Sequence, residues 1–359
     1  METQITFTDI EFEGIRKITR LEKTLNMMED KMPIDEWCEI VRPFYYVAGN
    51  GRQPTPLKII MRMYLLSHWQ NMSDEICEDM LCRDTVCRRF VGVTGNPPDA
   101  TVLGKFRNLL EEHKLNKKIF ESETKKLKEH GIIFQQGTII DSTIVNAADS
   151  WKNKKKESNP EFSSTQKGTN RYRGAKMHTG TDPKSGLVHS MATTTAKESD
   201  VTNAHKCIHG SETVVRGDAG YIGIEKRTEI CEKFACKSGE MEKIERRVPN
   251  SDRKKCYREK VLVHKKRAGI KFVVNRKRSQ LSVRDNHRKH EKAKSQKRWR
   301  GENPFLIIKH IFGYRRTRQP TLAKTDNKNY IMVVLANCYM CSQRGLSTKR
   351  DRLSTRLVA

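Results

Sequence analysis

The chain has 359 residues, and 70 lysines and arginines against 43 aspartates and glutamates give it a formal net charge of +27. Hydrophobic residues make up 36% of the sequence, which excludes a wholly disordered chain, and no apolar run approaches the about 20 residues of a membrane span. At about 100–200 residues per domain, the length allows two or three domains. The first residues lack the basic start and apolar stretch of a signal peptide, so we expect a cytoplasmic protein with reduced cysteines.

The positive charge is concentrated late in the chain. Residues 246–318 contain 26 lysines and arginines and five acidic residues, whereas residues 1–40 contain ten acidic and five basic residues. Because each lysine or arginine that neutralises a phosphate releases bound counterions, this basic block suits a surface that follows a nucleic-acid backbone. Interleaved aromatic residues such as Trp299 favour a folded block, and a solvated, partly disordered loop is the alternative.

Short helices are predicted between residues 57 and 113. Apolar residues recur at helical spacing after Leu57, and Ser73 marks the start of a second helical stretch that reaches Phe90. After a Gly-Asn-Pro-Pro break, Asp99 or Thr101 is expected to cap a further helix. Short helices joined by tight turns beside several arginines suit a helix-turn-helix-like DNA-binding region, and an ordinary helical bundle explains this stretch equally well.

The pattern changes near Gly131, where β-branched residues begin to predict strands. The expected strands cover residues 132–134, 138–145, 175–182, 187–196, 213–216 and 270–275. The expected helices cover residues 198–208, 225–234, 305–316 and 329–340. Strands that first form a hairpin and then alternate with helices indicate a mixed α/β sheet. Residues 151–173 predict a polar surface loop, and residues 342–359 predict a flexible tail.

Two acidic residues occupy positions typical of a site in this sheet. Asp141 lies within a β-branched strand, where a carboxylate is costly to bury unless it is paired or bound to a metal ion. Asp218 follows another strand in a glycine-flanked turn, and strand ends are where ligand sites collect in open α/β sheets. Two carboxylates from neighbouring strands suit Mg²⁺. From these residues alone, a salt bridge or a turn explains either aspartate equally well.

A third acid, Glu302, lies in a helix-forming segment between two cations. On a helix, Arg298 four residues before it and Lys309 seven residues after it share its face. One acid between two cations suits metal binding beside phosphate binding. Pro304 is expected to start or kink the helix, which would place Glu302 at the first turn. An ordinary amphipathic helix with an i,i+4 ion pair is the alternative.

The order Asp141, Asp218 and Glu302, with separations of 77 and 84 residues, resembles the DDE transposases of bacterial insertion sequences. Among these transposases, the sequence is most similar to the group named after insertion sequence five. The supporting motifs are Met72–Arg107, Asp141–Thr143, Arg173–Ser190, Ala196–Asp200, Gly217–Tyr221 and Glu302–Arg315. The sequence departs from a related signature at Ser295, where that signature has a tyrosine, and residues 236–300 have no counterpart that we can place.

The resemblance implies an α/β fold, with an RNase H-like mixed sheet flanked by helices after a small all-α helix-turn-helix-like domain. The implied domains are residues 1–125 for DNA binding and 131–340 for catalysis, with a basic insertion at about 236–297. Asp141, Asp218 and Glu302 are the implied catalytic and metal-binding residues. They would hold two Mg²⁺ or Mn²⁺ ions, with Asp141 bridging both. Arg298, Lys309, Arg315 and Arg316 are the expected DNA-binding residues. His178, on the adjacent strand, either faces the site or is a plain strand histidine.

The implied function is a DNA transposase that cuts at terminal inverted repeats and joins the ends to target DNA. Its expected partner is double-stranded DNA, bound by a homodimer near the nucleoid, with no membrane association. One alternative is a catalytically silent DNA-binding regulator derived from a transposase, which the departure at Ser295 keeps open. A second alternative is an RNase H-like nuclease without strand transfer.

Overall fold

The computed structural model describes residues 17–46, 53–134, 136–147, 159–227, 229–230, 241–249, 256–264, 270–276 and 285–344. The chain divides into two compact units. The helical unit comprises residues 1–132, 145–161 and 304–359, and the sheet unit comprises residues 133–144 and 162–303. No helix among the described residues combines the length and the apolar composition that crossing a membrane requires.

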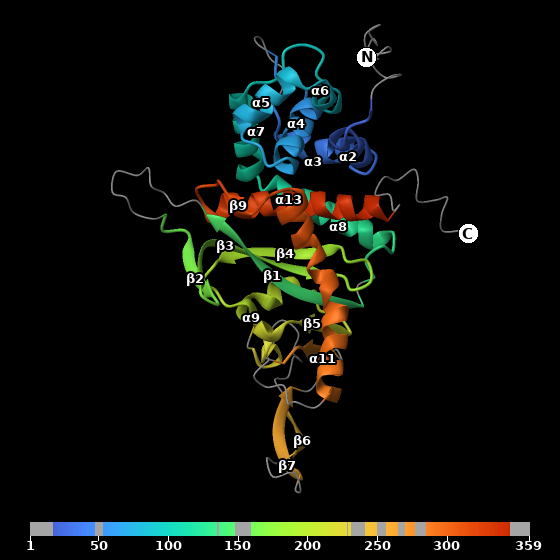
Figure 1. The fold of residues 1–359 in the computed structure, drawn as a ribbon, viewed down its shortest axis with the longest axis vertical. Coiled ribbons are helices and arrows are strands. Elements are labelled where there is room, and N and C mark those ends of the chain that lie inside the picture. The colour runs from blue at the N-terminus through green and yellow to red at the C-terminus, as the bar shows by residue number, and fades with distance from the viewer. Residues whose placement is uncertain are drawn as a thin grey trace, which may run out of the picture. The chain divides into compact units, whose positions relative to one another are not determined.

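The helical unit brings the N-terminal helices together with the last helix of the chain. Its helices are α2 (Arg20–Glu29), α3 (Ile34–Val41), α4 (Leu57–Trp69), α5 (Asp74–Arg83), α6 (Thr85–Val91), α7 (Ala100–Glu112), α8 (Leu115–Glu129) and α13 (Leu322–Gln343). Helix α13 packs against α8 and contacts α2, α4 and α7 (Figure 1). This all-helical N-terminal region confirms the prediction of helices there.

Polar caps explain where several of these helices begin. Ser73 Oγ accepts a hydrogen bond from the backbone N–H of Ile76 at 3.3 Å, and Asp99 Oδ1 accepts one from Val102 at 2.8 Å. These bonds satisfy amides that lack partners within a helix. Asp84 caps α6 in the same way, so the single helix predicted from Ser73 to Phe90 is wrong, and two helices occupy that stretch.

The core of the helical unit joins segments that are distant in sequence. Trp69 packs edge-to-face on Phe90 and Phe312, with ring centroids 6.4 and 6.1 Å apart. Asn116 donates to Tyr64 Oη at 2.7 Å and to the carbonyl of Asn327 at 3.1 Å. Helix α13 is therefore a core element, and it begins seven residues earlier than the predicted helix 329–340.

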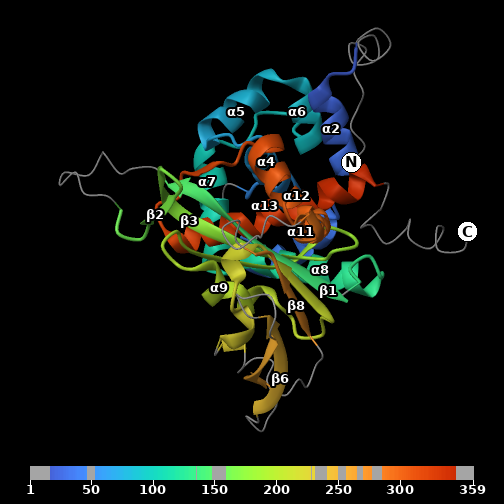
Figure 2. The same cartoon turned by 60° about the horizontal axis from the view of Figure 1, so that its bottom comes forward.

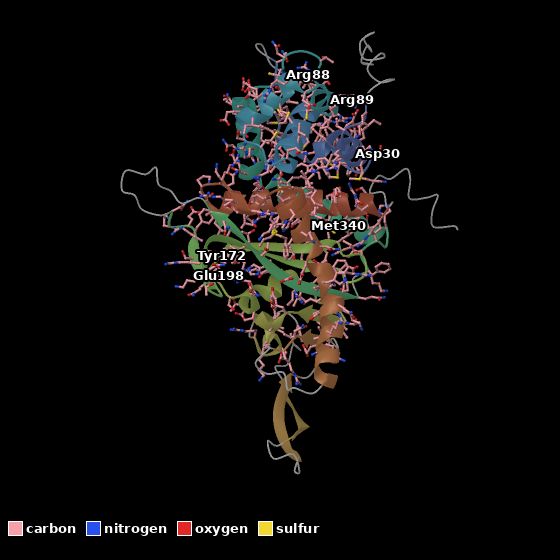
Figure 3. The ribbon with its side chains drawn as sticks, viewed as in Figure 1. Asp30, Arg88, Arg89, Tyr172, Glu198 and Met340 are labelled. Carbon is pink, nitrogen blue, oxygen red and sulfur yellow. The ribbon has the colours of Figure 1, made fainter. Side chains whose placement is uncertain are left out.

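The arginines of α6 are engaged within the helical unit (Figure 3). Arg88 donates to the carbonyls of Leu81 and Gly95 at 3.0 and 2.7 Å. Arg89 pairs with the buried carboxylate of Glu22 on α2. These two side chains therefore stabilise the packing of the helices.

The sheet unit is built on a mixed sheet in the order β2-β3-β1-β5-β8, with β4 also paired to β3. Strands β2, β3, β1 and β8 of this sheet are labelled in Figure 2. Its strands are β1 (Gly137–Ala147), β2 (Ser163–Lys167), β3 (Asn170–Thr181), β4 (Val188–Thr195), β5 (Val214–Gly217) and β8 (Lys271–Val274). Strands β1, β5 and β8 are parallel, whereas β3 is antiparallel to β2 and β4. The last residues of β1 pair with β9 (Arg316–Thr317) in the helical unit. The mixed sheet confirms the predicted fold class.

An apolar layer covers one face of this sheet. Helix α9 (Asp200–Asn203) continues into a 3₁₀ helix, Ala204–Cys207. Val201 and Cys207 are buried in one cluster with Ile140 of β1 and Val215 of β5. The helix predicted over residues 198–208 is therefore present as two short turns. This packing places α9 beside β1 and β5.

Several other predictions differ from the structure. Residues 132–134 form no strand, and β2 with the start of β3 lies inside the stretch predicted as the loop 151–173, of which residues 151–158 are not described. Residues 224–226 form a 3₁₀ turn, and residues 231–234 of the predicted helix 225–234 are not described. In the predicted tail, α13 continues to Gln343, and residues 345–359 are not described.

The basic stretch 236–297 contains regular structure where it is described. Strands β6 (Met241–Pro249) and β7 (Cys256–His264) form a separate antiparallel hairpin. Helix α11 (Asp285–Arg298) follows β8 and was not predicted. It ends at Arg298, and a 3₁₀ turn, Trp299–Gly301, leads to α12 (Asn303–Leu306).

Candidate active site

Asp141 projects from β1 into a largely dehydrated environment, where its side chain is 14% exposed. Its Oδ1 accepts a hydrogen bond from the backbone N–H of Ser142 at 2.9 Å, and its Oδ2 accepts one from Arg298 Nη1 at 3.0 Å. Burial raises the pKa of this carboxyl to about 6, although Arg298 acts in the opposite direction. A nearby cation therefore stabilises the charged form of Asp141.

Arg298 joins two acids that are distant in sequence. Besides the bond to Asp141, its Nη2 donates to Glu302 Oε1 at 2.6 Å, and its side chain is 17% exposed. The second contact is the i,i+4 ion pair of the alternative interpretation, and it is present beside the bond to Asp141. Because α11 ends at Arg298, a 3₁₀ turn rather than a continuous helix carries the chain between the two residues.

Close packing holds this turn against β1. A Cβ atom on Gly301 would lie 2.6 Å from Cγ2 of Ile139, which is shorter than any normal contact. A glycine is therefore required for the turn to approach the strand so closely. The side chain of Glu302, the next residue, is 55% exposed, so it remains accessible to a ligand.

Asp218 follows β5 at the level of Asp141. The parallel register pairs Ile139 with Arg216, and two residues further along each strand lead to Asp141 and Asp218. Asp218 Oδ1 accepts a hydrogen bond from the N–H of Gly220 at 2.8 Å. The charges of both Asp218 and Glu302 raise the pKa of Asp141, so both lie close enough to act on it.

A fourth carboxylate, Asp200, lies beside these residues. It is the first residue of α9, and its Oδ1 accepts a hydrogen bond from Ser142 Oγ at 2.8 Å. Burial raises the pKa of Tyr221 well above its ordinary value, and the charges of Asp200, Asp141 and Asp218 raise it further. This tyrosine therefore has three carboxylates around it. Sequence reasoning missed Asp200, although it ends the motif Ala196–Asp200.

His178 is buried on β3 and belongs to the surroundings of Asp200. Its Nε2 lies 2.8 Å from Thr194 Oγ1, and its Nδ1 lies 3.8 Å from Asp200 Oδ1. Burial lowers the pKa of this histidine to about 4, so its ring is neutral near pH 7. These contacts place it next to the fourth carboxylate.

The other predicted DNA-binding residues lie in the helical unit. Lys309 is in a π-helical turn, Ile307–Ile311, and Arg316 is exposed in β9. Arg315 is also exposed, and it donates to the carbonyl of Lys309 at 3.2 Å. The helix predicted over residues 305–316 is interrupted at Gly313, whose φ is 69°. Arg298 is thus the predicted cation that the structure brings to the acids.

The chemistry of the three acids fits a hard divalent cation, because carboxylate oxygens are its preferred ligands. Among the described residues, no group of three or more histidines, cysteines or acids is already arranged around one point to hold a metal ion. Arg298 supplies positive charge between Asp141 and Glu302. The donor set is therefore suitable, with a guanidinium compensating two of the carboxylates.

The comparisons with protein families agree with this geometry. A model described as "Transposase DDE domain" matches residues 133–338, and a second, "Transposase domain (DUF772)", matches residues 13–109. No solved structure matches the chain. The first match spans more than half of the chain and contains Asp141, Asp218 and Glu302. Its domain type is that of polynucleotidyl transferases and endonucleases, and the chain therefore belongs to the DDE transposases of insertion sequences.

Proposed function

We propose that this transposase binds the terminal inverted repeats of its element, cuts the DNA there and joins the ends to target DNA. The observation that carries the proposal is Arg298, which bonds to both Asp141 and Glu302 while Asp218 follows the neighbouring strand. Asp141 and Glu302 thus share one cation, Asp218 follows the strand next to that of Asp141, and all three lie within the family match. The affiliation with the insertion-sequence-five group stays a prediction.

We infer that Asp141, Asp218 and Glu302 are the catalytic residues and hold the metal. DDE transposase domains generally use divalent metal ions, and we propose two Mg²⁺ or Mn²⁺ ions here. Such ions would activate a water or a DNA 3′-hydroxyl and stabilise the leaving oxygen. The raised pKa of Asp141 supports its role, since a cation favours the carboxylate form. Until the substrate binds, the positive charge of Arg298 offsets the negative charges of Asp141 and Glu302.

DNA contacts are proposed for Arg298, Lys309, Arg315 and Arg316. Arg315 and Arg316 are exposed, as phosphate contacts require. We further propose that residues 1–125 bind DNA, that residues 131–340 catalyse the reaction with 236–297 as a basic insertion, and that the DNA complex contains a homodimer. The abundance of lysine and arginine in residues 246–318 supports a DNA surface there.

The test uses purified full-length protein, labelled terminal-repeat DNA and Mg²⁺. Asp141→Asn, Asp218→Asn and Glu302→Gln should each reduce cleavage by at least about 10³-fold while end binding stays within about twofold, because each removes a metal-binding carboxylate. Asp79→Asn, which changes an exposed acid of α5, is the matched control and should cut at the wild-type rate.

The products distinguish the proposal from its alternatives. Cleavage followed by joining supports a transposase, cleavage without joining supports a nuclease, and binding without cleavage supports a silent regulator. A wild-type cleavage rate in any one of the three acid variants would contradict the assignment of that residue.

A further inference from the structure

We propose that Asp200 is a positioning residue, which holds the middle of β1 and the turn after β5 so that Asp141 and Asp218 present their carboxylates together. The inference rests on the proposed function, because it assigns Asp200 a role toward the same metal-binding acids. Three observations support it: a hydrogen bond to β1, the close approach of the turn after β5, and an ion pair with a buried lysine.

The contact to β1 passes through Ser142. The hydroxyl of this serine donates to Asp200 Oδ1 at 2.8 Å, while its backbone N–H donates to Asp141 Oδ1 at 2.9 Å. One residue is thus bonded to both acids. Because Asp200 fixes the side chain of Ser142, it restrains the backbone amide that orients the carboxylate of Asp141.

The approach to β5 occurs at Gly220. A Cβ atom built on this glycine would lie 3.8 Å from Asp200 Oδ2 and 3.0 Å from Asp218 Oδ1. The two carboxylates therefore flank one glycine, whose N–H bonds to Asp218. Oδ1 of Asp200 thus bonds to Ser142 of β1, while its Oδ2 lies near the turn that follows β5.

A buried lysine anchors Asp200. Lys176 Nζ lies 3.1 Å from Asp200 Oδ1, and it also donates to the carbonyl of Glu198 at 2.6 Å. The side chain of Lys176 is 10% exposed, and a buried charge needs a partner. Glu198 belongs to the loop before α9 and is labelled in Figure 3. The pair therefore fixes Asp200 to β3, which leaves its carboxylate little freedom.

The experiment measures Mn²⁺ binding to the DNA-free, full-length protein by calorimetry, together with the Mg²⁺ dependence of terminal-repeat cleavage. Residues that orient metal ligands change metal affinity by about 10–100-fold when they are removed. Asp200→Ala should weaken Mn²⁺ binding by at least about tenfold and raise the Mg²⁺ concentration for half-maximal cleavage. Asp200→Asn keeps an acceptor for Ser142 and should show a smaller loss. End binding should stay unchanged.

Thr202→Ala is the matched control, since Thr202 lies on α9 and its hydroxyl bonds only to near neighbours among the described contacts, the carbonyl of Ser199 and the side chain of Asn203. It should bind Mn²⁺ as the wild type does. Wild-type Mn²⁺ affinity in folded Asp200→Ala would overturn the inference, even if its melting temperature falls. If Asp200→Ala does not fold, wild-type Mn²⁺ affinity in Asp200→Asn would overturn the inference instead. A wild-type protein that neither binds Mn²⁺ nor cuts DNA would instead overturn the proposed function, and the inference with it.

Discussion

Arg298 shows how much of the site depends on one side chain. Its guanidinium bonds to Glu302, four residues away, and to Asp141, 157 residues away. The nearer contact follows from helical spacing, and it could be predicted from the sequence. The second contact depends on how α11 meets β1, which no local pattern contains. A mutation of Arg298 would leave a buried carboxylate without its cation, and such losses are costly.

Lys328, on α13, carries a prediction about pH. Burial lowers the pKa of its ammonium from 10.5 to about 8, and Nζ lies 4.6 Å from the centre of the Tyr314 ring. Between about pH 8 and 10.5 the unfolded chain binds more protons at this site than the folded chain, so stability rises with pH there. The gain is about 3 kcal/mol. Urea unfolding should show this rise in the wild type and lose it in Lys328→Met.

Lys324→Met provides the comparison on the same helix, because Lys324 pairs with Glu111 at 3.2 Å. It should keep the wild-type dependence on pH. An unchanged pH dependence in Lys328→Met would show that the buried ammonium contributes nothing to it.

At the scale of elements, the turn between α11 and α12 depends on its contact with β1. Gly301→Ala would place a Cβ atom 2.6 Å from Cγ2 of Ile139. Overpacking of this kind costs about 1–3 kcal/mol, and the displaced turn should carry Glu302 away from its position. We therefore expect a lower free energy of unfolding and slower cleavage, measured by urea unfolding and by the terminal-repeat assay.

Gly95→Ala is the control, because a Cβ atom there meets nothing within 4 Å. Gly95→Ala should leave the free energy of unfolding and the cleavage rate nearly unchanged. In an Ile139→Ala background, the methyl group added by Gly301→Ala no longer meets a Cγ2 atom. The loss in free energy of unfolding caused by Gly301→Ala should therefore be smaller. An equal cost in both backgrounds would contradict the proposed clash.

Local patterns predicted the ends of some elements better than others. The cap at Asp99 and the helix start near Pro304 agree with α7 and α12, because caps involve residues within one turn. The helix expected over residues 305–316 fails because Gly313 adopts a positive φ and Tyr314 turns into the core. Helix α11 was missed because its sequence is almost entirely polar.

For the whole molecule, the charge of +27 predicts how DNA binding responds to salt. Many phosphate contacts should lower the affinity for terminal-repeat DNA by about 10³-fold or more between about 50 and 200 mM salt. Arg315→Ala and Arg316→Ala should each reduce the slope of log affinity against log salt by about one. Lys128→Ala, on α8 and outside both residues 1–125 and the basic block, should leave the slope unchanged. A flat salt response would contradict DNA binding by residues 246–318.

The sequence alone determined the family of this protein. The order of Asp141, Asp218 and Glu302, the late block of positive charge and the motifs around them predicted the transposase family that the family match confirms. These signals lie in residue identity and spacing, which are properties of the sequence itself. Only the tertiary structure decided that α13 packs into the N-terminal helices, that Arg298 joins Asp141 to Glu302, and that Asp200 bonds to β1 near the turn after β5. Such contacts join residues 58 or more positions apart, so they depend on packing of the whole chain rather than on local preference.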